Sequence, residues 1–149
     1  MLYSKTTFVT FISVTIFFCF HLNALAGSKE DYQLEERCGK RAAERFKEGY
    51  GKGSWSDKDT SYTANYINHY NRKLNKCFVL LIGVTIRKND KENLGTGTDK
   101  TLWDINENKQ YGIFFKFSNM SEPTTCEVLG KFCYSETEWD SLVNPYMEE

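Results

Sequence analysis

Four cysteines are the residues of this sequence with the clearest chemistry. They are Cys38, Cys77, Cys126 and Cys133, which follow an N-terminal segment of the export type; the fifth cysteine, Cys19, lies within that segment and is expected to be removed with it. An even number of cysteines in an exported chain predicts two disulfides, although four cysteines permit three pairings. The segment between Cys126 and Cys133 contains Gly130 and can fold back on itself, which favours this pair and leaves Cys38 with Cys77.

A metal site is the alternative use of these cysteines. Zinc sites usually contain a close Cys-x-x-Cys pair or several histidines, whereas these cysteines are far apart and His69 is the single histidine after residue 26. Residues 57–59 resemble the start of a calcium loop, but Tyr62 stands where such a loop needs glycine and Asn68 where it needs glutamate. We therefore expect neither a metal nor another cofactor.

Acid–base chemistry would need a histidine or a pair of carboxylates. Histidine is the usual side chain for acid–base chemistry near neutral pH, but strand alternation places His69 on the opposite face from Asn68 and Tyr70, which favours a structural role. No serine has the context of a nucleophile elbow, and paired cysteines cannot act as thiolates. We expect a protein without catalytic residues. The alternative is a glycan hydrolase that uses two of the carboxylates Asp104, Glu107 and Glu138.

Two groups of residues are candidates for binding. If Cys126 and Cys133 are paired, the loop between them presents a rigid surface to a partner, and a preorganised loop loses little entropy on binding. Its candidate residues are Val128, Leu129, Gly130 and Lys131. The second group is basic and is predicted to attract acidic lipid headgroups or an anionic polysaccharide. It consists of Arg37, Arg41, Arg45, Arg72, Lys73 and Lys76.

Aromatic side chains gather around the first expected strand. Such residues can stack on sugars or anchor a partner protein, but ordinary packing within the core and on the sheet is the favoured interpretation. The residues are Tyr50, Trp55, Tyr62, Tyr66 and Tyr70.

Two helices are expected to frame these residues. Over residues 28–48, apolar side chains recur every fourth position, as on the buried face of a helix, and Cys38 lies in this stripe. Near the end of the chain, Ser135 and Glu138 have the spacing of a capping box and open an amphipathic helix that Pro145 should end or kink.

Four strands are expected between the helices. Residues 62–86 predict a hairpin whose second arm, residues 77–86, is apolar on both faces and therefore central in a sheet. Alternating apolar residues at 101–105 and 111–117 predict two further strands, and short connections favour an antiparallel arrangement. We predict an α+β fold: an N-terminal helix packed on an antiparallel sheet of about four strands, a disulfide-stapled loop and a short C-terminal helix.

The N-terminus predicts export. Lys5 precedes an apolar run of about 15 residues, which is short for a membrane span, and Ala24-Leu25-Ala26 fits a signal peptidase site. We expect residues 1–26 to be a signal peptide without a remaining transmembrane anchor, and residues 27–149 to be a single, monomeric domain. Without Lys5, the formal charge of −1 becomes −2, which argues against nucleic-acid binding.

Three segments of the chain resemble a group of small exported bacterial proteins without an assigned function. They are HYNRKLNKCF, KTLWDINENKQYG and CEVLGKFCYSETEWDSLVNPYMEE. This resemblance covers most of the mature chain and implies a periplasmic location, but it transfers no active-site residue. We therefore expect a non-catalytic, periplasmic or secreted binding module whose partner is an envelope protein or an anionic polysaccharide. A purely structural envelope protein is a further alternative.

Overall fold

The computed structural model describes residues 29–88 and 95–148. The chain forms two compact units, Met1–Leu34 and Glu35–Glu149, and each is described by itself. In the first unit, residues 29–34 are helical. The expected signal peptide, residues 1–26, and the expected helix start at Ser28 lie outside the described residues.

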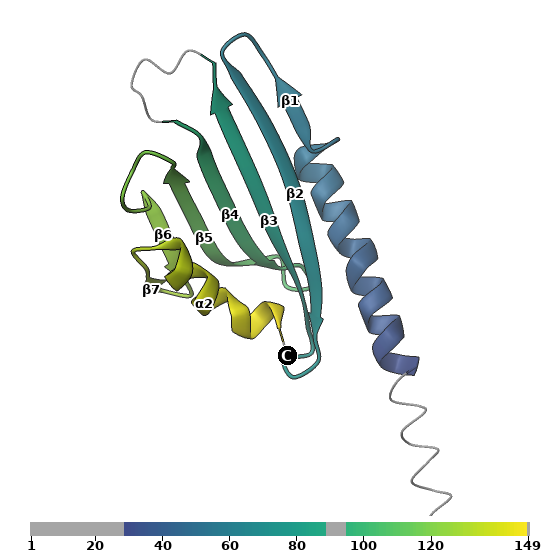
Figure 1. The fold of residues 1–149 in the computed structure, drawn as a ribbon. Helices are drawn as coiled ribbons and strands as arrows, with labels where there is room; N and C mark the ends of the chain where they lie inside the picture. The colour runs from purple at the N-terminus through teal and green to yellow at the C-terminus, as the bar shows by residue number, and fades with distance from the viewer. Residues whose placement is uncertain (1–28, 89–94, 149) are drawn as a thin grey trace, which may run out of the picture. The chain divides into compact units, whose positions relative to one another are not determined.

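The second unit has an α+β fold with one antiparallel sheet (Figure 1). Its seven strands pair in chain order, so the sheet is a simple meander. The helix of residues 29–50 enters this unit at residue 35, and the remaining elements follow from β1 to α2. They are β1 (Ser54–Ser56), β2 (Thr60–Asn71), β3 (Lys76–Arg87), β4 (Gly97–Asp104), β5 (Lys109–Phe117), β6 (Thr125–Val128), β7 (Lys131–Phe132) and α2 (Glu136–Met147).

The α+β class and the antiparallel pairing are confirmed, but the prediction of about four strands is wrong. The three extra strands are short: β1 lies before the first strand that we expected, and β6 and β7 form the expected disulfide loop. The β2–β3 hairpin is the longest pairing in the sheet, running from Thr60 opposite Arg87 to Asn71 opposite Lys76. This hairpin therefore forms the scaffold of the unit.

The N-terminal helix packs on one face of the sheet. Ala42 is fully buried against Val79 and Leu81 of β3, and Phe46 packs beside them. The disulfide between Cys38 and Cys77 is confirmed, with 5.4 Å between the two Cα atoms. It joins the buried stripe of the helix to the start of β3, as the four-residue spacing predicted.

Helix α2 packs on the opposite face. Its Trp139 lies in a core with Phe78, Leu102 and Phe114, whose positions on the strands alternate with those that face the N-terminal helix. Trp139 is fully buried, and it occupies the space above Gly112, where a Cβ atom would lie 2.7 Å from its ring. The glycine is therefore required for this packing.

The ends of α2 are held by side chains. Ser135 is the N-cap, as predicted, and its hydroxyl accepts a hydrogen bond of 3.2 Å from the backbone N–H of Glu138. At the other end, the helix continues past Pro145 to Met147. The buried Asn71 of β2 donates from Nδ2 to the carbonyl of Pro145 over 3.1 Å, so the end of α2 is tied to the β2–β3 hairpin.

Candidate binding surfaces

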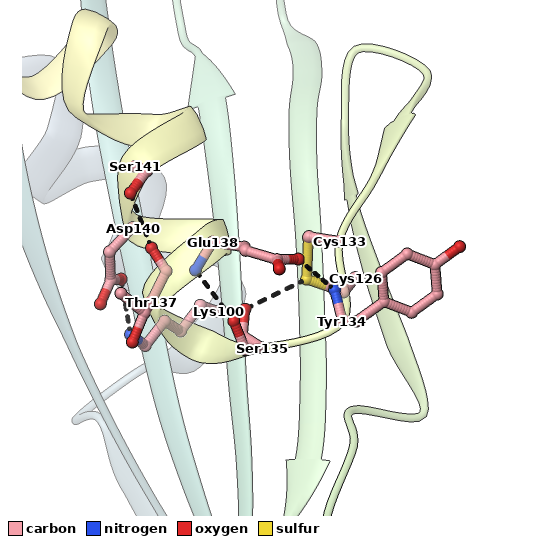
Figure 2. The surroundings of a disulfide bond; sticks show 9 residues. All are labelled: Lys100, Cys126, Cys133, Tyr134, Ser135, Thr137, Glu138, Asp140 and Ser141. Carbon is pink, nitrogen blue, oxygen red and sulfur yellow. Dashed lines mark hydrogen bonds and ion pairs between the residues drawn. A yellow bond between two sulfur atoms is a disulfide. The ribbon is translucent and has the colours of Figure 1, made fainter.

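The segment from Cys126 to Cys133 is a closed β-hairpin rather than an irregular loop. The predicted disulfide is confirmed, with 5.0 Å between the Cα atoms, and it links β6 to the residue after β7 (Figure 2). Leu129 and Gly130 form the turn with φ values of 48° and 80°. Two positive φ values are typical of the two-residue turn whose twist matches that of a sheet. The backbone of this hairpin is therefore preorganised.

The hairpin presents a different set of side chains from the one that we predicted. Val128 is 2% exposed and packs in the core with Trp139, because its position on β6 faces α2; it is not available to a partner. Leu129, Gly130 and Lys131 are exposed, as the prediction requires. The most exposed large side chains are Phe132 and Tyr134, at 73% and 68%.

Phe132 and Tyr134 were missed because we placed the loop by its disulfide alone. They flank Cys133, which is buried, so the alternation along an extended segment turns both of them outward. Figure 2 shows the ring of Tyr134 pointing away from α2. An aromatic residue on each side of a disulfide cysteine is the sequence signal that would have indicated this exposure.

A groove of about 320 Å³ separates the hairpin from the first turns of α2. Its lining combines the apolar side chains of Phe132 and Leu142 with Cys133 and the polar residues Thr137, Glu138 and Ser141. The Glu138 carboxylate accepts a hydrogen bond of 2.7 Å from the backbone N–H of Tyr134, which holds the helix against the hairpin (Figure 2). This groove can take an apolar side chain.

The predicted basic residues on the N-terminal helix contact neighbouring side chains. Arg41 donates from Nη1 to Asn106 over 2.5 Å, and the Arg45 guanidinium lies 4.8 Å from the centre of the Trp103 ring. Arg37 is exposed. Arg41 and Arg45 line a groove of about 350 Å³ with Ile105 and Asn108, in which Glu44 and Glu48 alternate with the arginines. The acidic residues reduce the attraction of this groove for anions.

The basic residues in and beside the β2–β3 turn differ in their contacts. Arg72 forms an ion pair of 2.7 Å with Glu35, whereas Lys73 is exposed. Lys76 pairs with Asp104 and with Glu107, at 2.7 Å each. Hydrogen bonds from its ammonium group, first to Asp104 and then to Glu107, raise the pKa of Lys76. Lys76 therefore connects strands within the fold and is not free to bind an anionic polymer.

The carboxylates considered for glycan hydrolysis also have structural partners. Asp104 is fully buried, and its Oδ1 accepts the backbone N–H groups of Asn106 and Glu107 at 3.0 and 3.2 Å. Glu107 and Asp104 both form ion pairs with Lys76, and Glu138 accepts the hydrogen bond that holds the β6–β7 hairpin to α2. Because Asp104 has no accessible surface, it cannot reach a sugar in this conformation.

His69 is half-buried, and its Nε2 is buried without a hydrogen-bond partner among the described residues. Among residues 29–88 and 95–148, no group of three or more histidine, cysteine or acidic side chains is arranged to hold a metal ion. In the same part of the chain, no helix is both long and apolar enough to cross a bilayer.

Three of the five predicted aromatic residues stack in a row beside the β1–β2 pairing. Tyr62 stacks on Trp55 of β1 and on Tyr50 at the end of the N-terminal helix, with ring centres 6.0 and 6.2 Å apart. Trp55 is 53% exposed. The Tyr62 hydroxyl donates to Oδ2 of Asp99 over 3.2 Å. Tyr66 packs on Phe46 nearby, and Tyr70 is buried at the far end of β2.

Burial changes the ionisation of this hydroxyl–carboxyl pair. Partial burial raises the pKa of Asp99, an effect that the hydrogen bond from Tyr62 only partly offsets. Burial, together with the nearby Asp99 charge, also raises the pKa of Tyr62. The Tyr62 hydroxyl is therefore a hydrogen-bond donor at neutral pH, and the Asp99 carboxylate is less stable than it would be in water.

The raised pKa of Asp99 predicts a pH dependence of stability. Above the ordinary value of 3.8 and up to the raised pKa, the folded state binds more protons than the unfolded chain, so stability falls as pH rises. Asn at this position has no charge to desolvate. We therefore expect the Asp99→Asn variant to gain stability relative to the native protein as pH rises through this window, with no such gain below it.

Urea unfolding of both proteins at several values between about pH 3 and pH 7 measures this difference. A difference in free energy of unfolding that stays constant with pH, or that changes in the opposite direction, would contradict the burial of the Asp99 charge.

Comparison of the chain with protein-family models, with curated proteins and with solved structures finds no match.

Proposed function

We propose that this protein is a non-catalytic, exported binding module whose docking surface is the β6–β7 hairpin with the adjacent groove of α2. The observation that carries the proposal is the exposure of Phe132 and Tyr134, at 73% and 68%, on a hairpin closed by a disulfide. Large aromatic side chains are the residues most often responsible for binding energy at protein interfaces.

The rigidity of the hairpin supports this role. Its disulfide and the hydrogen bond between Tyr134 and Glu138 fix the backbone on both sides of Cys133. A surface that is ordered before binding loses less conformational entropy when a partner docks. The groove beside Phe132 offers about 320 Å³ to one apolar side chain of that partner.

The partner that fits this surface is a protein with an extended segment. β7 is the last strand of the sheet, and Cys133 uses its N–H to bond the carbonyl of Cys126 at 3.0 Å. In an antiparallel ladder the backbone groups of the preceding residue, Phe132, then point away from β6. An added strand could bond them while its apolar side chain enters the groove.

Export is part of the same proposal. The two disulfides fit an oxidising compartment such as the periplasm or the extracellular space, and the N-terminal segment has the composition of a signal peptide.

Co-purification from the exported fraction of cells that make the protein tests the docking surface. We expect tagged native protein to retain a partner and the double variant Phe132→Ala/Tyr134→Ala to retain at least about tenfold less, because it loses both anchors. Trp55→Ala is the matched control, since it also removes an exposed aromatic side chain, 53% accessible, but from β1.

Two results would contradict the proposal. In the first, the double variant retains the partner as well as Trp55→Ala does. In the second, the native protein retains no protein above the level of an untagged control.

A further inference from the structure

A second surface, distinct from the hairpin, combines an exposed indole with converging polar groups. Trp55 lies on β1, the outermost strand beside β2 (Figure 1). One side of its ring stacks on Tyr62, yet more than half of the side chain remains accessible. Burial in the core therefore does not explain the choice of tryptophan at this position, whereas a ligand that stacks on the open part of the ring would.

The polar groups lie on the same face of the sheet, Tyr62 on β2 and Asp99 on β4. Gly83 has no side chain, and the Tyr62 hydroxyl and the Asp99 carboxylate both occupy the space above it. A Cβ atom there would lie 2.2 Å from the hydroxyl oxygen and 2.4 Å from Oδ1 of Asp99. Gly83 thus brings a hydroxyl and a carboxylate together on the sheet surface, 3.2 Å apart and only partly buried.

The available hydrogen-bonding capacity is that of a carbohydrate site. A carboxylate offers about four acceptor positions, and the described partners of Asp99 are the Tyr62 hydroxyl and its own backbone N–H. Acceptor positions on the Asp99 carboxylate therefore remain for sugar hydroxyl groups. Hydrogen bonds from hydroxyls to a charged carboxylate are stronger than those between neutral groups. The apolar C–H face of a pyranose ring can meanwhile pack on the indole.

The size of the surface fits more than one sugar unit. Trp55 is on β1 and Asp99 is on β4, which are three strand spacings apart in the sheet, or about 14 Å between backbones. The stacked rings of Trp55, Tyr62 and Tyr50 occupy the part of this surface that is nearest to Trp55. A negative charge at Asp99 disfavours acidic polymers, so the ligand is expected to be neutral.

We propose that Trp55, Tyr62 and Asp99 form a carbohydrate-binding site for a neutral oligosaccharide of gluco-configured pyranose units. Trp55 provides the stacking surface, the Asp99 carboxylate accepts hydrogen bonds from sugar hydroxyls, and Tyr62 orients that carboxylate while extending the aromatic platform. The site lies on β1, β2 and β4 and does not depend on the β6–β7 hairpin.

Calorimetric titration with cellotetraose, maltotetraose and the tetramer of N-acetylglucosamine tests this site. We expect the native protein to bind at least one of the three with a dissociation constant below about 1 mM. Trp55→Ala and Asp99→Ala should each weaken that binding by about tenfold or more, since each removes one of the two kinds of contact. Met120→Ala, which removes a side chain that is 41% exposed and lies outside both proposed sites, is the control and should bind like the native protein.

Tryptophan fluorescence gives an independent readout. Trp139 is fully buried and Trp103 is covered by Arg45, so quenching by acrylamide reports mainly on Trp55. Bound sugar should reduce this quenching in the native protein and have no such effect in Trp55→Ala.

Three results would overturn the carbohydrate site. The first is the absence of saturable binding of all three oligosaccharides up to about 10 mM. The second is binding that survives both Trp55→Ala and Asp99→Ala. The third is tighter binding of choline than of any sugar, which would instead assign the rings and the carboxylate to an organic cation. Because none of these results involves the hairpin, the proposed protein-docking role is tested separately.

Discussion

Replacing Cys38 and Cys77 together by alanine is expected to lower the free energy of unfolding by about 4 kcal/mol. The disulfide closes a loop with a sequence separation of 39, and loop-closure entropy predicts a stabilisation of this size. Both cysteines are 2% exposed and join the N-terminal helix to β3, so the helix is expected to lose its attachment as well. Urea unfolding at neutral pH measures the change.

The second disulfide supplies the control for this prediction. Cys126 and Cys133 are separated by 7 in sequence, and the same relation gives about 2.4 kcal/mol for the variant Cys126→Ala/Cys133→Ala. The long bridge should therefore be the more stabilising of the two. An equal or larger loss on removing the short bridge would show that the N-terminal helix is held on the sheet mainly by its apolar contacts.

Replacing Trp139 by alanine is expected to cost about 3–5 kcal/mol of stability, the usual range for removing a large buried aromatic side chain. Its ring is fully buried on Phe114, with 5.8 Å between ring centres, and it occupies the space above Gly112. Removal leaves a cavity between α2 and the sheet, where Phe114 and Leu102 are held by paired strands and cannot move in to fill it.

Thermal and urea unfolding of Trp139→Ala measure this cost. Trp55→Ala is the control, because its side chain is 53% exposed and a surface substitution typically changes stability by less than about 0.5 kcal/mol. A loss below about 1 kcal/mol for Trp139→Ala would contradict the position of α2 on the sheet.

The disulfides and the helices could be predicted from the sequence because their signals are local. The stripe that contains Cys38, Ala42 and Phe46 identifies the buried face of the N-terminal helix, and Ser135 with Glu138 identifies the start of α2. The pairing of Cys126 with Cys133 follows from their short separation. In each case the residues that carry the signal are neighbours in the chain or on one helical face.

The short strands could not be predicted, because pairing rather than composition makes them strands. β1 consists of Ser54, Trp55 and Ser56, all exposed, and its register opposite Thr63, Tyr62 and Ser61 gives it its conformation. Intrinsic strand preference is weak compared with such tertiary context.

The availability of the candidate site residues could not be predicted from the sequence for the same reason. Lys76 reads as one more basic residue in a turn, but the β3–β4 register brings it to Asp104, 28 positions away in the chain. Val128 reads as part of an exposed loop, but the β5–β6 register turns it toward Trp139. Long-range register, which one sequence does not contain, decided which of the predicted residues are available to a partner.

Site-specific photo-crosslinking in cells tests the central claim, that the β6–β7 hairpin is a protein-docking surface, most directly. A photoreactive phenylalanine analogue replaces Phe132 in one variant and Met120, which is 41% exposed outside the hairpin, in another. We predict a crosslinked partner protein from position 132, mapped to an extended segment of that partner, and none from position 120. Equal crosslinking from both positions, or none from position 132, would contradict a docking function for the hairpin.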